Sequence, residues 1–400
     1  MTNPMKILFL SRWFPFPADN GSKLRIFNLI KILANEHQVD LISFTSEPVS
    51  DKRLKGLSPY CQKVEPVIYK DFDPMSPKSR LGYFSKRPRY IVDTYRREFK
   101  ESVESACLKT KYDLVVASQV DMTPYTQDIA GVKVLLDEME LAIHNEARFK
   151  PGSKLHIFKA NLTWWKHSRY VAEVLERTDG ISVVSEGERR LVAPLNKAGC
   201  RVQVIPNGVD MDYYQGDWGN PEPDTMIYAG ALTYIANLDA MQYFVAEILP
   251  LIKKKRPKAK LIITGKVTDQ IRGSLPMEAN VEFTGYLEDV RPKIGTAWLS
   301  VIPLRIGGGT RLKILESLSM GTPVVSTSKG AEGLDLKPGR DILIQDKPGE
   351  FALEVVKLLE HEDLRARLGA AGKQTVGSQY NWKLIGDRLL KFVDEIVCEK

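Results

Sequence analysis

The sequence is poor in cysteine and has no long apolar run. Its cysteines are far apart and form no CxxC pair, at Cys61, Cys107, Cys200 and Cys398. Scattered thiols of this kind supply neither the spacing of a zinc site nor a disulfide framework, and they are typical of a reducing compartment. No stretch of about 18 apolar residues occurs, and the first apolar run, residues 7–10, is too short for a signal-peptide core. We therefore expect a cytoplasmic protein without a membrane-spanning helix.

Low-complexity tracts and short-period repeats are also absent. Gly (28) and Pro (23) are near average usage, and the 43% hydrophobic and 27% charged residues are ordinary for a globular protein. The disordered, collagen-like and disulfide-rich classes are thereby excluded. The length of 400 residues exceeds the roughly 100–200 residues of one ordinary domain, so two domains are expected.

The positive charge is unevenly distributed along the chain. The net charge is +7, from 57 Lys and Arg against 50 Asp and Glu. Residues 1–210 contain 32 basic and 25 acidic residues, whereas residues 211–400 contain 25 of each, so the whole excess lies in the first half. This excess indicates either an ordinary solvated surface or an acidic partner such as a membrane, a nucleic acid or a phosphorylated substrate.

Short apolar runs alternate with helical patterns in both halves. Because these runs lack polar alternation, they predict parallel strands covered on both faces, and therefore an α/β fold. In the first half we predict strands at residues 6–10, 39–44, 114–117, 132–136, 181–184 and 202–205. In the second half we predict strands at residues 226–228, 260–264, 281–283, 299–303, 323–326 and 341–344.

A polar, turn-rich segment at residues 211–225 separates the two halves. We expect one doubly wound domain at residues 1–210 and a second at 226–378. A C-terminal amphipathic helix at 379–400 is expected to pack back toward the first domain. Open parallel sheets bind ligands outside the carboxyl ends of their strands, so two such domains suggest two ligands that meet, as in a transferase.

The segment at residues 303–325 contains the densest chemical signal. It follows a predicted strand and opens a helix, and it combines three glycines with Arg311, Lys313 and Glu316. Glycines let a backbone approach a ligand closely, and a helix N-terminus favours an anion such as a pyrophosphate. A carboxylate farther along could accept hydrogen bonds from a ribose. The alternative is a tight turn with solvated charges.

Several segments together resemble a known family. They read PNGVD at 206–210, AGAL at 229–232, NLDA at 237–240, NVEFTGY at 280–286 and ESLSMGTPVVST at 316–327, with an N-terminal loop ending in NGS at 20–22. These segments are similar to the family 4 retaining glycosyltransferases. The resemblance implies the GT-B architecture, in which two Rossmann-like domains face each other across a cleft.

The resemblance also implies the ligands and the residues that bind them. A nucleotide-diphosphate sugar would bind mainly to the second domain, with Glu316 on the ribose, because it matches the second Glu of the family's E-x7-E signature. The implied donor-binding residues are Gly21, Ser22, Gly230, Asn237, Lys266, Tyr286, Leu287, Gly308, Gly309, Thr310, Arg311, Lys313 and Glu316. The acceptor would be a lipid-linked sugar or an oligosaccharide, and the process would be cell-surface glycan or polysaccharide synthesis.

The sequence departs from the family pattern in three places. Gly308 occupies the position of the first Glu of the signature, so contact with the donor sugar must come from backbone or from elsewhere. Residues 231–252 contain no Lys or Arg, so we expect Arg311, Lys313 and Lys266 to supply the charge for the pyrophosphate. Gln119 occupies the expected place of a His near the transferred sugar. We assign catalytic roles to Gln119, Gly308 and Lys313.

The segment after the predicted strand at 132–136 is rich in acids. Asp137, Glu138 and His144 are candidates for an acceptor site, and the alternative is a capped loop with surface acids. No metal or other cofactor is expected, because the DxD pair at Asp210 and Asp212 lies in the connecting segment. A metal site formed by Asp137, Glu138 and Glu140 is the alternative.

Two stretches of the first half combine cations with aromatic residues. Residues 78–111 contain ten Lys and Arg against four acids, and residues 148–169 contain six against none. This composition suits an anionic membrane interface and predicts a peripheral protein on the inner face of the cytoplasmic membrane. The alternative is a pair of core helices with basic outer faces. We expect no nucleic-acid partner, since no nucleic-acid module is recognisable.

We therefore expect a retaining, hexosyltransferase-like glycosyltransferase. Same-face attack, with the leaving phosphate assisting deprotonation, is implied by the resemblance and needs no enzymic nucleophile. Catalysis would then depend on positioning and on neutralising the leaving diphosphate. The alternatives are a nucleotide-sugar epimerase and a nucleotide-sugar-binding protein without activity.

Overall fold

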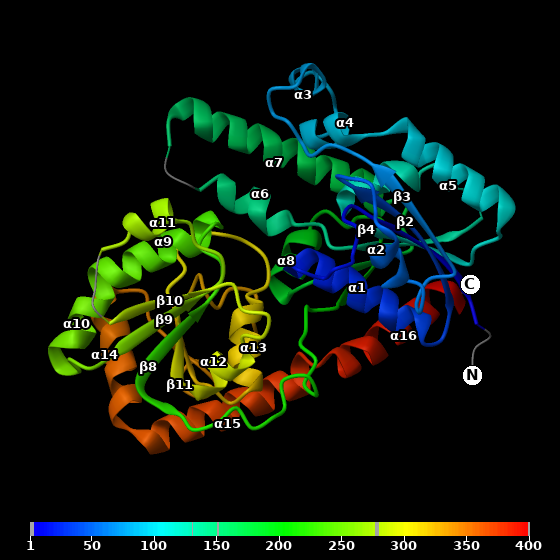
Figure 1. The fold of residues 1–400 in the computed structure, drawn as a ribbon. Helices are drawn as coiled ribbons and strands as arrows, with labels where there is room; N and C mark the ends of the chain where they lie inside the picture. The colour runs from blue at the N-terminus through cyan, green and yellow to red at the C-terminus, as the bar shows by residue number, and fades with distance from the viewer. Residues whose placement is uncertain (1–3, 130, 150–151, 277–279, 399–400) are drawn as a thin grey trace. The chain divides into compact units, whose positions relative to one another are not determined.

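The computed structural model describes residues 4–129, 131–149, 152–276 and 280–398. The chain forms two compact units, of which the first comprises Met1–Pro206 with Gly386–Lys400 and the second comprises Asn207–Ile385 (Figure 1). The first piece of the first unit ends at Pro206, and the chain returns to this unit at Gly386. Each unit is built on its own parallel sheet, and each is described separately below.

The first unit contains a seven-stranded parallel sheet in the order β3-β2-β1-β4-β5-β6-β7. Its strands are β1 (Lys6–Ser11), β2 (Gln38–Thr45), β3 (Lys63–Ile68), β4 (Leu114–Ser118), β5 (Lys133–Asp137), β6 (Gly180–Val183) and β7 (Arg201–Val204). Ile7, Leu8, Phe9 and Leu10 of β1 are fully buried, as the unbroken apolar run predicts for a strand covered on both faces.

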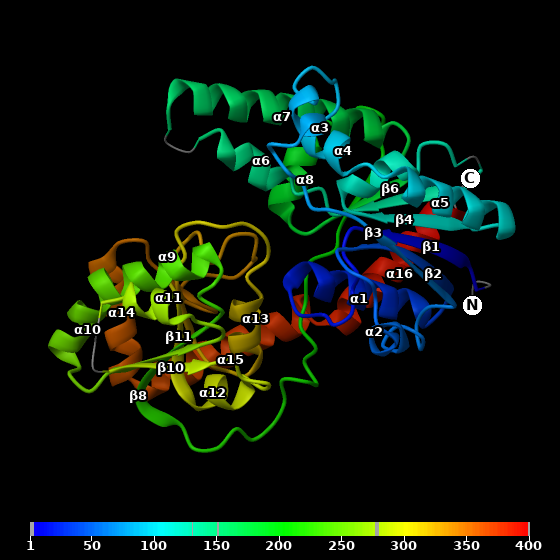
Figure 2. The same ribbon diagram turned by 45° about the horizontal axis from the view of Figure 1, so that its top comes forward.

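Helices cover both faces of this sheet (Figures 1 and 2). They are α1 (Gly21–Ala34), α2 (Asp51–Lys55), α3 (Pro77–Leu81), α4 (Arg89–Thr94), α5 (Arg97–Lys109), the 3-10 helix η1 (Val120–Tyr125), α6 (Leu141–Ala147), α7 (Lys154–Leu175) and α8 (Glu186–Val192). Leu8 and Leu10 share one hydrophobic core with Phe99 of α5 and Val171 of α7.

The last helix, α16 (Trp382–Cys398), belongs to the first unit from Gly386 onward. A methyl group on Gly180 of β6 would lie 2.3 Å from Ile396, and one on Gly386 would lie 3.3 Å from Ile32 of α1. The helix therefore packs directly on the sheet and beside α1. This is the segment that the sequence predicts as a C-terminal amphipathic helix.

The second unit contains a six-stranded parallel sheet in the order β10-β9-β8-β11-β12-β13. Its strands are β8 (Glu222–Ala229), β9 (Lys260–Thr264), β10 (Val281–Gly285), β11 (Ala297–Ile302), β12 (Val324–Ser326) and β13 (Leu343–Ile344). Its helices are α9 (Ile235–Tyr243), the π-helix η2 (Phe244–Ile248), α10 (Leu249–Lys255), α11 (Asp269–Gly273), α12 (Arg291–Thr296), α13 (Leu312–Ser319), α14 (Pro348–Glu360) and α15 (Glu362–Gln379).

One helical segment, Ile235–Lys255, is long and apolar enough to cross a membrane by length and composition. More than half of the most apolar part of this segment is buried inside the unit. Phe244, Ile248 and Ile252 of this segment belong to the main hydrophobic core. Its apolar character is therefore explained by packing against the second sheet.

Both sheets reverse their strand order at one internal position. The first sheet reverses between β1 and β4, and the second between β8 and β11. Ligands of open α/β sheets bind in the crevice at such a switch point, outside the carboxyl ends of the strands. The switch points therefore mark the expected ligand positions of the two sheets.

Candidate functional site

In the second unit, Lys313 lies at the switch point between β8 and β11. Its side chain leaves the first turn of α13 and donates hydrogen bonds to Tyr228 Oη (2.9 Å) and Asn237 Oδ1 (2.9 Å). Tyr228 in turn donates to Asn237 Oδ1 at 2.7 Å, and Asn237 donates to the carbonyl of Ala231 at 2.8 Å. The ammonium group of Lys313 thus lies at the turn after β8. The residues that follow β8 in the chain, 231–252, contain no Lys or Arg of their own.

Gly230 makes room for this ammonium group. A Cβ atom at Gly230 would lie 2.7 Å from Lys313 Nζ and 2.9 Å from Asn237 Nδ2, which is closer than real contacts allow. Because glycine has no Cβ, the lysine reaches the backbone of the turn directly. Gly230 thus leaves the space that the Lys313 side chain occupies. Its contact with a donor remains a prediction.

Burial shifts the pKa values of the two charged groups Lys313 and Glu316. Burial lowers the pKa of Lys313 to about 7, although Glu316 raises it and Arg311 lowers it further. Burial raises the pKa of Glu316, and the hydroxyl of Tyr214 hydrogen-bonds to this carboxylate. A bound anion would favour the charged form of Lys313.

Arg311 stabilises the glycine-rich loop rather than extending away from it. It is 6% exposed, and its guanidinium donates to the carbonyls of Gly307 (2.9 Å), Gly308 and Gly309 (2.5 Å). Gly307 and Gly309 have positive φ angles of 105° and 78°, which glycine adopts without strain. The carbonyl of Gly308 already accepts one hydrogen bond, from Arg311.

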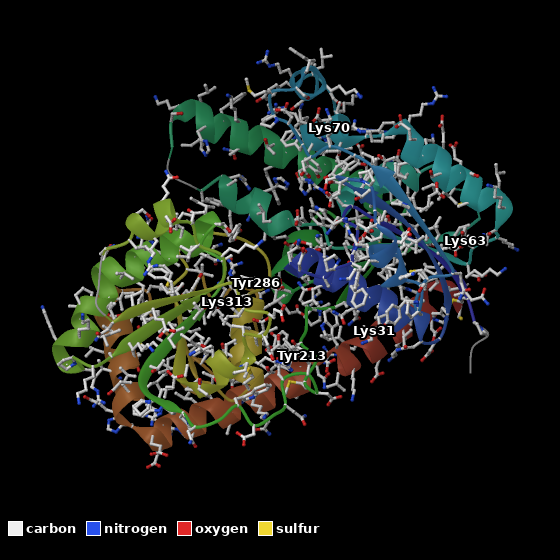
Figure 3. All side chains as sticks on the ribbon, in the orientation of Figure 1. Lys31, Lys63, Lys70, Tyr213, Tyr286 and Lys313 are labelled. Atoms are coloured by element: carbon white, nitrogen blue, oxygen red, sulfur yellow. The ribbon has the colours of Figure 1, made fainter. Side chains whose placement is uncertain are left out.

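The other predicted donor-binding residues lie on neighbouring loops of the same sheet edge. Lys266 follows β9 and is exposed, and Tyr286 follows β10 and is 69% exposed, with Leu287 beside it. Figure 3 labels Lys313 and Tyr286, both on the side of the sheet where the strands end. Thr310 accepts a hydrogen bond from Asn207 at 2.9 Å, within the same unit. Their roles toward a donor remain predictions.

In the first unit, two predicted site residues begin a helix after β1. Gly21 and Ser22 form the first turn of α1, and the side chain of Asn20 caps it by accepting from the N–H of Lys23 at 3.0 Å. This places the predicted glycine loop at the carboxyl edge of the first sheet. Contact of these two residues with a donor remains a prediction.

Asp137 is not placed to contact an acceptor. It is 1% exposed, and its carboxylate is paired with the buried Arg25 at 2.5 Å and accepts from Ser182 at 2.5 Å. Arg25 also donates to the carbonyl of Ile205. The sequence interpretation of Asp137 as an acceptor-side residue is therefore wrong, because a buried ion pair that joins α1, β5 and β6 uses both of its oxygens.

The remaining first-unit candidates line a cavity of about 270 Å³. Gln119, Glu138 and His144 all contribute to its wall. Asp121 and Glu140, which the sequence analysis did not single out as acceptor candidates, line the same cavity. Their position directly after strands β4 and β5 is the signal that could have identified them, since polar residues at strand ends meet at one sheet edge.

The backbone is strained where it forms this wall. Gln119, Glu138 and Glu140 have positive φ angles of 73°, 60° and 52°, which residues with a Cβ rarely adopt. Each such residue costs about 1–3 kcal/mol, and strain of this kind concentrates at functional sites. The cavity is therefore formed by a specific local conformation at the ends of β4 and β5.

The titratable groups of this wall are shifted by burial. Burial raises the pKa of Glu138 to about 7, and the neighbouring Glu140 raises it further, whereas Arg25 lowers it. Burial also raises the pKa of Asp121 and lowers that of His144. In the described part of the chain, no group of three or more His, Cys, Asp or Glu residues is arranged to hold a metal ion.

The two basic, aromatic stretches fold as helices with mixed exposure. Phe149, Leu155, Phe158 and Trp165 around α7 are between 54% and 74% exposed, and Phe84 after α3 is 92% exposed. Lys154 and Lys159 are also exposed, whereas residues 150 and 151 lie outside the described part.

Lys166 is an exception to the predicted basic surface. It is 6% exposed, and it donates to the carbonyls of Gly82 (3.1 Å) and Tyr83 (2.6 Å). Its inclusion among the surface cations was therefore wrong, because its ammonium group joins α7 to the end of α3.

Comparisons with known proteins find similarity to glycosyltransferases in the second unit. Residues 223–361 match the family described as Glycosyl transferases group 1. A GDP-mannose-dependent monoacylated alpha-(1-6)-phosphatidylinositol monomannoside mannosyltransferase of Corynebacterium glutamicum is 28% identical over 156 residues, which cover 35% of this chain and 40% of that protein. An uncharacterized 44.6 kDa protein in the cps region of Klebsiella pneumoniae is 22% identical over 88% of this chain and 90% of its own length.

The fold is shared with solved glycosyltransferase structures. Anabaena HepE in complex with UDP superposes with a TM-score of 0.69 at 14% identity, over 98% of this chain and 100% of that chain. Sucrose-phosphate synthase from Thermosynechococcus elongatus superposes with a TM-score of 0.69 at 15% identity, over 98% and 99%. The expected α/β fold, with two Rossmann-like sheets of GT-B type, is confirmed.

Proposed function

Starting from a second unit that carries a glycosyl transferases group 1 domain, we propose that this chain transfers a sugar from a nucleotide-diphosphate sugar to an acceptor hydroxyl. The comparisons support a nucleotide-sugar glycosyltransferase, and structures of HepE with UDP and with UDP-glucose share the fold. The observation that carries the proposal is the position of Lys313. Its ammonium group lies at the switch point of the second sheet, within reach of the N-terminal turn of α13 and the carboxylate of Glu316.

In this proposal the second unit binds the nucleotide and its diphosphate. Lys313 neutralises the diphosphate, and Glu316 accepts hydrogen bonds from the ribose hydroxyls. Both groups are pre-positioned, Lys313 by Tyr228 and Asn237 and Glu316 by Tyr214. Charge that develops on the leaving phosphate would meet an ammonium group in a site with little water, where its effect is large.

We further propose retention at the anomeric carbon, on the basis of the family resemblance. Same-face attack uses the leaving phosphate to assist deprotonation of the acceptor, so it makes no demand for a nucleophile from the protein. The chain's own contribution would be to hold the acceptor hydroxyl on the same face of the anomeric carbon as the leaving phosphate and to exclude water. Product stereochemistry, read by NMR from the anomeric coupling of the transferred sugar, tests this part directly.

Lys313→Met tests the donor site. We expect nucleoside diphosphate and donor binding to weaken about ten- to hundredfold, because a charge-assisted contact of about 1.5–3 kcal/mol is lost. Isothermal titration with UDP and with GDP measures the effect, and Lys254→Met, at an exposed position of α10, is the matched control. Unchanged nucleotide affinity in Lys313→Met would place the diphosphate elsewhere.

A transfer assay distinguishes the proposed reaction from its alternatives. An epimerase would change the sugar of the donor without an acceptor, and an inactive binding protein would leave the donor intact. We expect transfer that depends on the acceptor, with free nucleoside diphosphate as the second product. Epimerised donor in the absence of an acceptor would contradict the proposal.

The acceptor is proposed to be lipid-linked, with the protein peripheral on the inner face of the cytoplasmic membrane. Exposed aromatic and apolar side chains on α7 lie beside Lys154 and Lys159, a combination that suits an anionic interface. The corynebacterial relative is named for a phosphatidylinositol mannoside acceptor, which is a lipid.

A further inference from the structure

We propose that a groove between α10 and the start of α14 binds an anionic amphiphile, which is a molecule with one apolar chain and one anionic head group. The two helices lie side by side in the second unit (Figures 1 and 2), and the α10–α14 groove has a volume of about 520 Å³. Its lining residues differ from those around Lys313, so the site is independent of the proposed transfer reaction. Three features support this ligand class: an apolar floor, two lysines without an acidic partner, and few groups that could recognise a sugar or a base.

The floor of the groove is apolar because of the order of residues along α14. Leu353 and Val356 follow Gly349 at positions i+4 and i+7, so the three residues lie on one face of the helix. Val356 is buried, Leu353 is 46% exposed, and Leu251 of α10 adds to the apolar lining. A leucine that is nearly half exposed in a hollow offers apolar surface that a ligand can remove from water.

Gly349 keeps one end of this helix face open. Apart from its chain neighbours and its own helical turn, no atom of the described residues lies within 4 Å of the position that a Cβ would take at Gly349. Ala352, the next lining residue along α14 after Glu350, is also small. The volume of about 520 Å³ is within the roughly 300–1,000 Å³ of small-molecule sites, so the groove has room for one small ligand.

Two lysines at the end of α10 give the groove its positive charge. Lys254 and Lys255 line it and are exposed, and within the described part of the chain neither side chain forms an ion pair or a hydrogen bond. The other two charges of the lining cancel, because Lys347 is paired with Glu350 at 3.1 Å. A helix C-terminus carries about half a negative charge, so two lysines leave an excess of positive charge that an anionic head group can neutralise.

The lining has few groups that could recognise a sugar or a nucleobase. Its polar side chains are those of the three lysines and Glu350. A polar ring would therefore lose water without regaining its hydrogen bonds, and a cationic head group would be repelled by Lys254 and Lys255. An apolar chain with an anionic head group matches both the floor and the charged end of the groove.

The occupant is a single dispersed molecule and not a bilayer surface. Ala352 and Val356 are each only 4% exposed, so the apolar floor is recessed. A bilayer contacts side chains that protrude, as those of Phe158 and Trp165 on α7 do, whereas a free chain can lie along the floor beside Leu353.

Isothermal titration of the full chain at neutral pH tests both parts of the ligand. The probes are octanoate, decanoate and decyltrimethylammonium, each below its critical micelle concentration. We expect saturable binding of decanoate, at least tenfold weaker binding of the cationic probe, and an affinity that rises about fourfold per methylene from octanoate to decanoate. Equal or tighter binding of decyltrimethylammonium would overturn the proposal, as would the lack of saturable decanoate binding.

Two variants locate the binding. Lys254→Glu with Lys255→Glu should weaken decanoate at least tenfold and tighten decyltrimethylammonium, a reversal that partial unfolding would not produce. Gly349→Leu should fill the groove and weaken decanoate at least tenfold without lowering the thermal unfolding temperature, since the added side chain enters open space. Unchanged decanoate affinity in both variants would overturn the assignment to this groove.

Lys154→Glu with Lys159→Glu is the matched control, because these exposed lysines lie on α7 with its exposed apolar side chains. We expect this control to bind decanoate as the unmodified protein does. Loss of decanoate binding in the control, with binding kept in both groove variants, would place the amphiphile on α7 and overturn the proposal. The groove variants should still sediment with anionic liposomes, and loss of sedimentation would assign the groove to a membrane surface instead of a dispersed molecule.

Discussion

We expect the protonation state of Lys313 to change when a diphosphate binds. Burial lowers its pKa to about 7, so at about pH 8 the free protein carries this lysine mostly neutral. A bound diphosphate favours the ammonium form and raises its pKa, so binding at that pH takes up a proton. We expect affinity for nucleoside diphosphate to fall as the pH rises above 7.

Titration calorimetry measures this proton uptake. At about pH 8, two buffers of different ionisation enthalpy should give binding enthalpies that differ by the uptake of up to about one proton per site. Lys313→Arg is the matched variant, because arginine stays charged and should bind nucleotide without the uptake. Equal enthalpies in both buffers for the unmodified protein would contradict the prediction.

Gly230→Ala tests the geometry around the same ammonium group. The added methyl would lie 2.7 Å from Lys313 Nζ and 2.9 Å from Asn237 Nδ2, and the φ of 158° at Gly230 adds backbone strain, so we expect some loss of stability as well as displacement of the ammonium group. Nucleotide affinity should fall about tenfold, since the displaced ammonium loses about one charge-assisted contact. Gly273→Ala, where nothing lies within 4 Å of the added atom, is the control. A loss of thermal stability without a loss of affinity would argue against a functional role for this contact.

Candidate site residues could be predicted where they are adjacent in the sequence. The run from Gly307 to Glu316 is contiguous, and the structure places its charged members at one sheet edge. Tyr228 and Asp121 were not predicted because their importance comes from partners distant in the sequence. Asp137 was misassigned for the same reason, since its partner Arg25 is 112 residues away.

At the scale of elements, the contact between β6 and α16 can be tested. A methyl group on Gly180 would lie 2.3 Å from Ile396, so Gly180→Ala should overpack this interface and destabilise the first unit by about 1–3 kcal/mol. Hydrogen-exchange mass spectrometry should show faster exchange in β6 and α16 than in the unmodified protein. Gly187→Ala in α8 is the control, because the added methyl would have a single neighbour within 4 Å, Ser185 Oγ at 3.4 Å. Unchanged exchange in β6 would contradict this account of the packing.

Most strands were predicted from the sequence, and one of those missed is an edge strand. Strand β1 is found where residues 6–10 predict it, because a strand buried on both faces has little choice of composition. Strand β3 was missed because it is an edge strand, with charged residues and Pro66 among only six positions. An edge strand tolerates proline, which a central strand does not. Strand β8 begins at Glu222 and therefore includes the end of the predicted connecting segment.

At the scale of the whole molecule, the excess positive charge predicts peripheral membrane binding. Each Lys or Arg near an anionic surface contributes about 1 kcal/mol, and the attraction decays over roughly 8–10 Å. We expect the protein to sediment with anionic liposomes, less so as salt rises, and not with neutral ones. Lys154→Ser with Lys159→Ser should weaken this binding and leave nucleotide binding intact, whereas Lys254→Ser with Lys255→Ser should not weaken it. Protein that stays in the supernatant at low salt would favour a soluble acceptor.

The first unit consists of two pieces of chain that are separated by the whole of the second unit. A ribosome adds about 5–20 residues per second, so roughly 10–40 s pass between the end of the first piece and the arrival of the residues after Ile385. During that interval β6 has been made but the helix that covers it has not. The nascent chain therefore carries an uncovered apolar sheet face while its second unit is being synthesised, which is the kind of surface that chaperones bind. The first unit should consequently mature last, although most of it is made first.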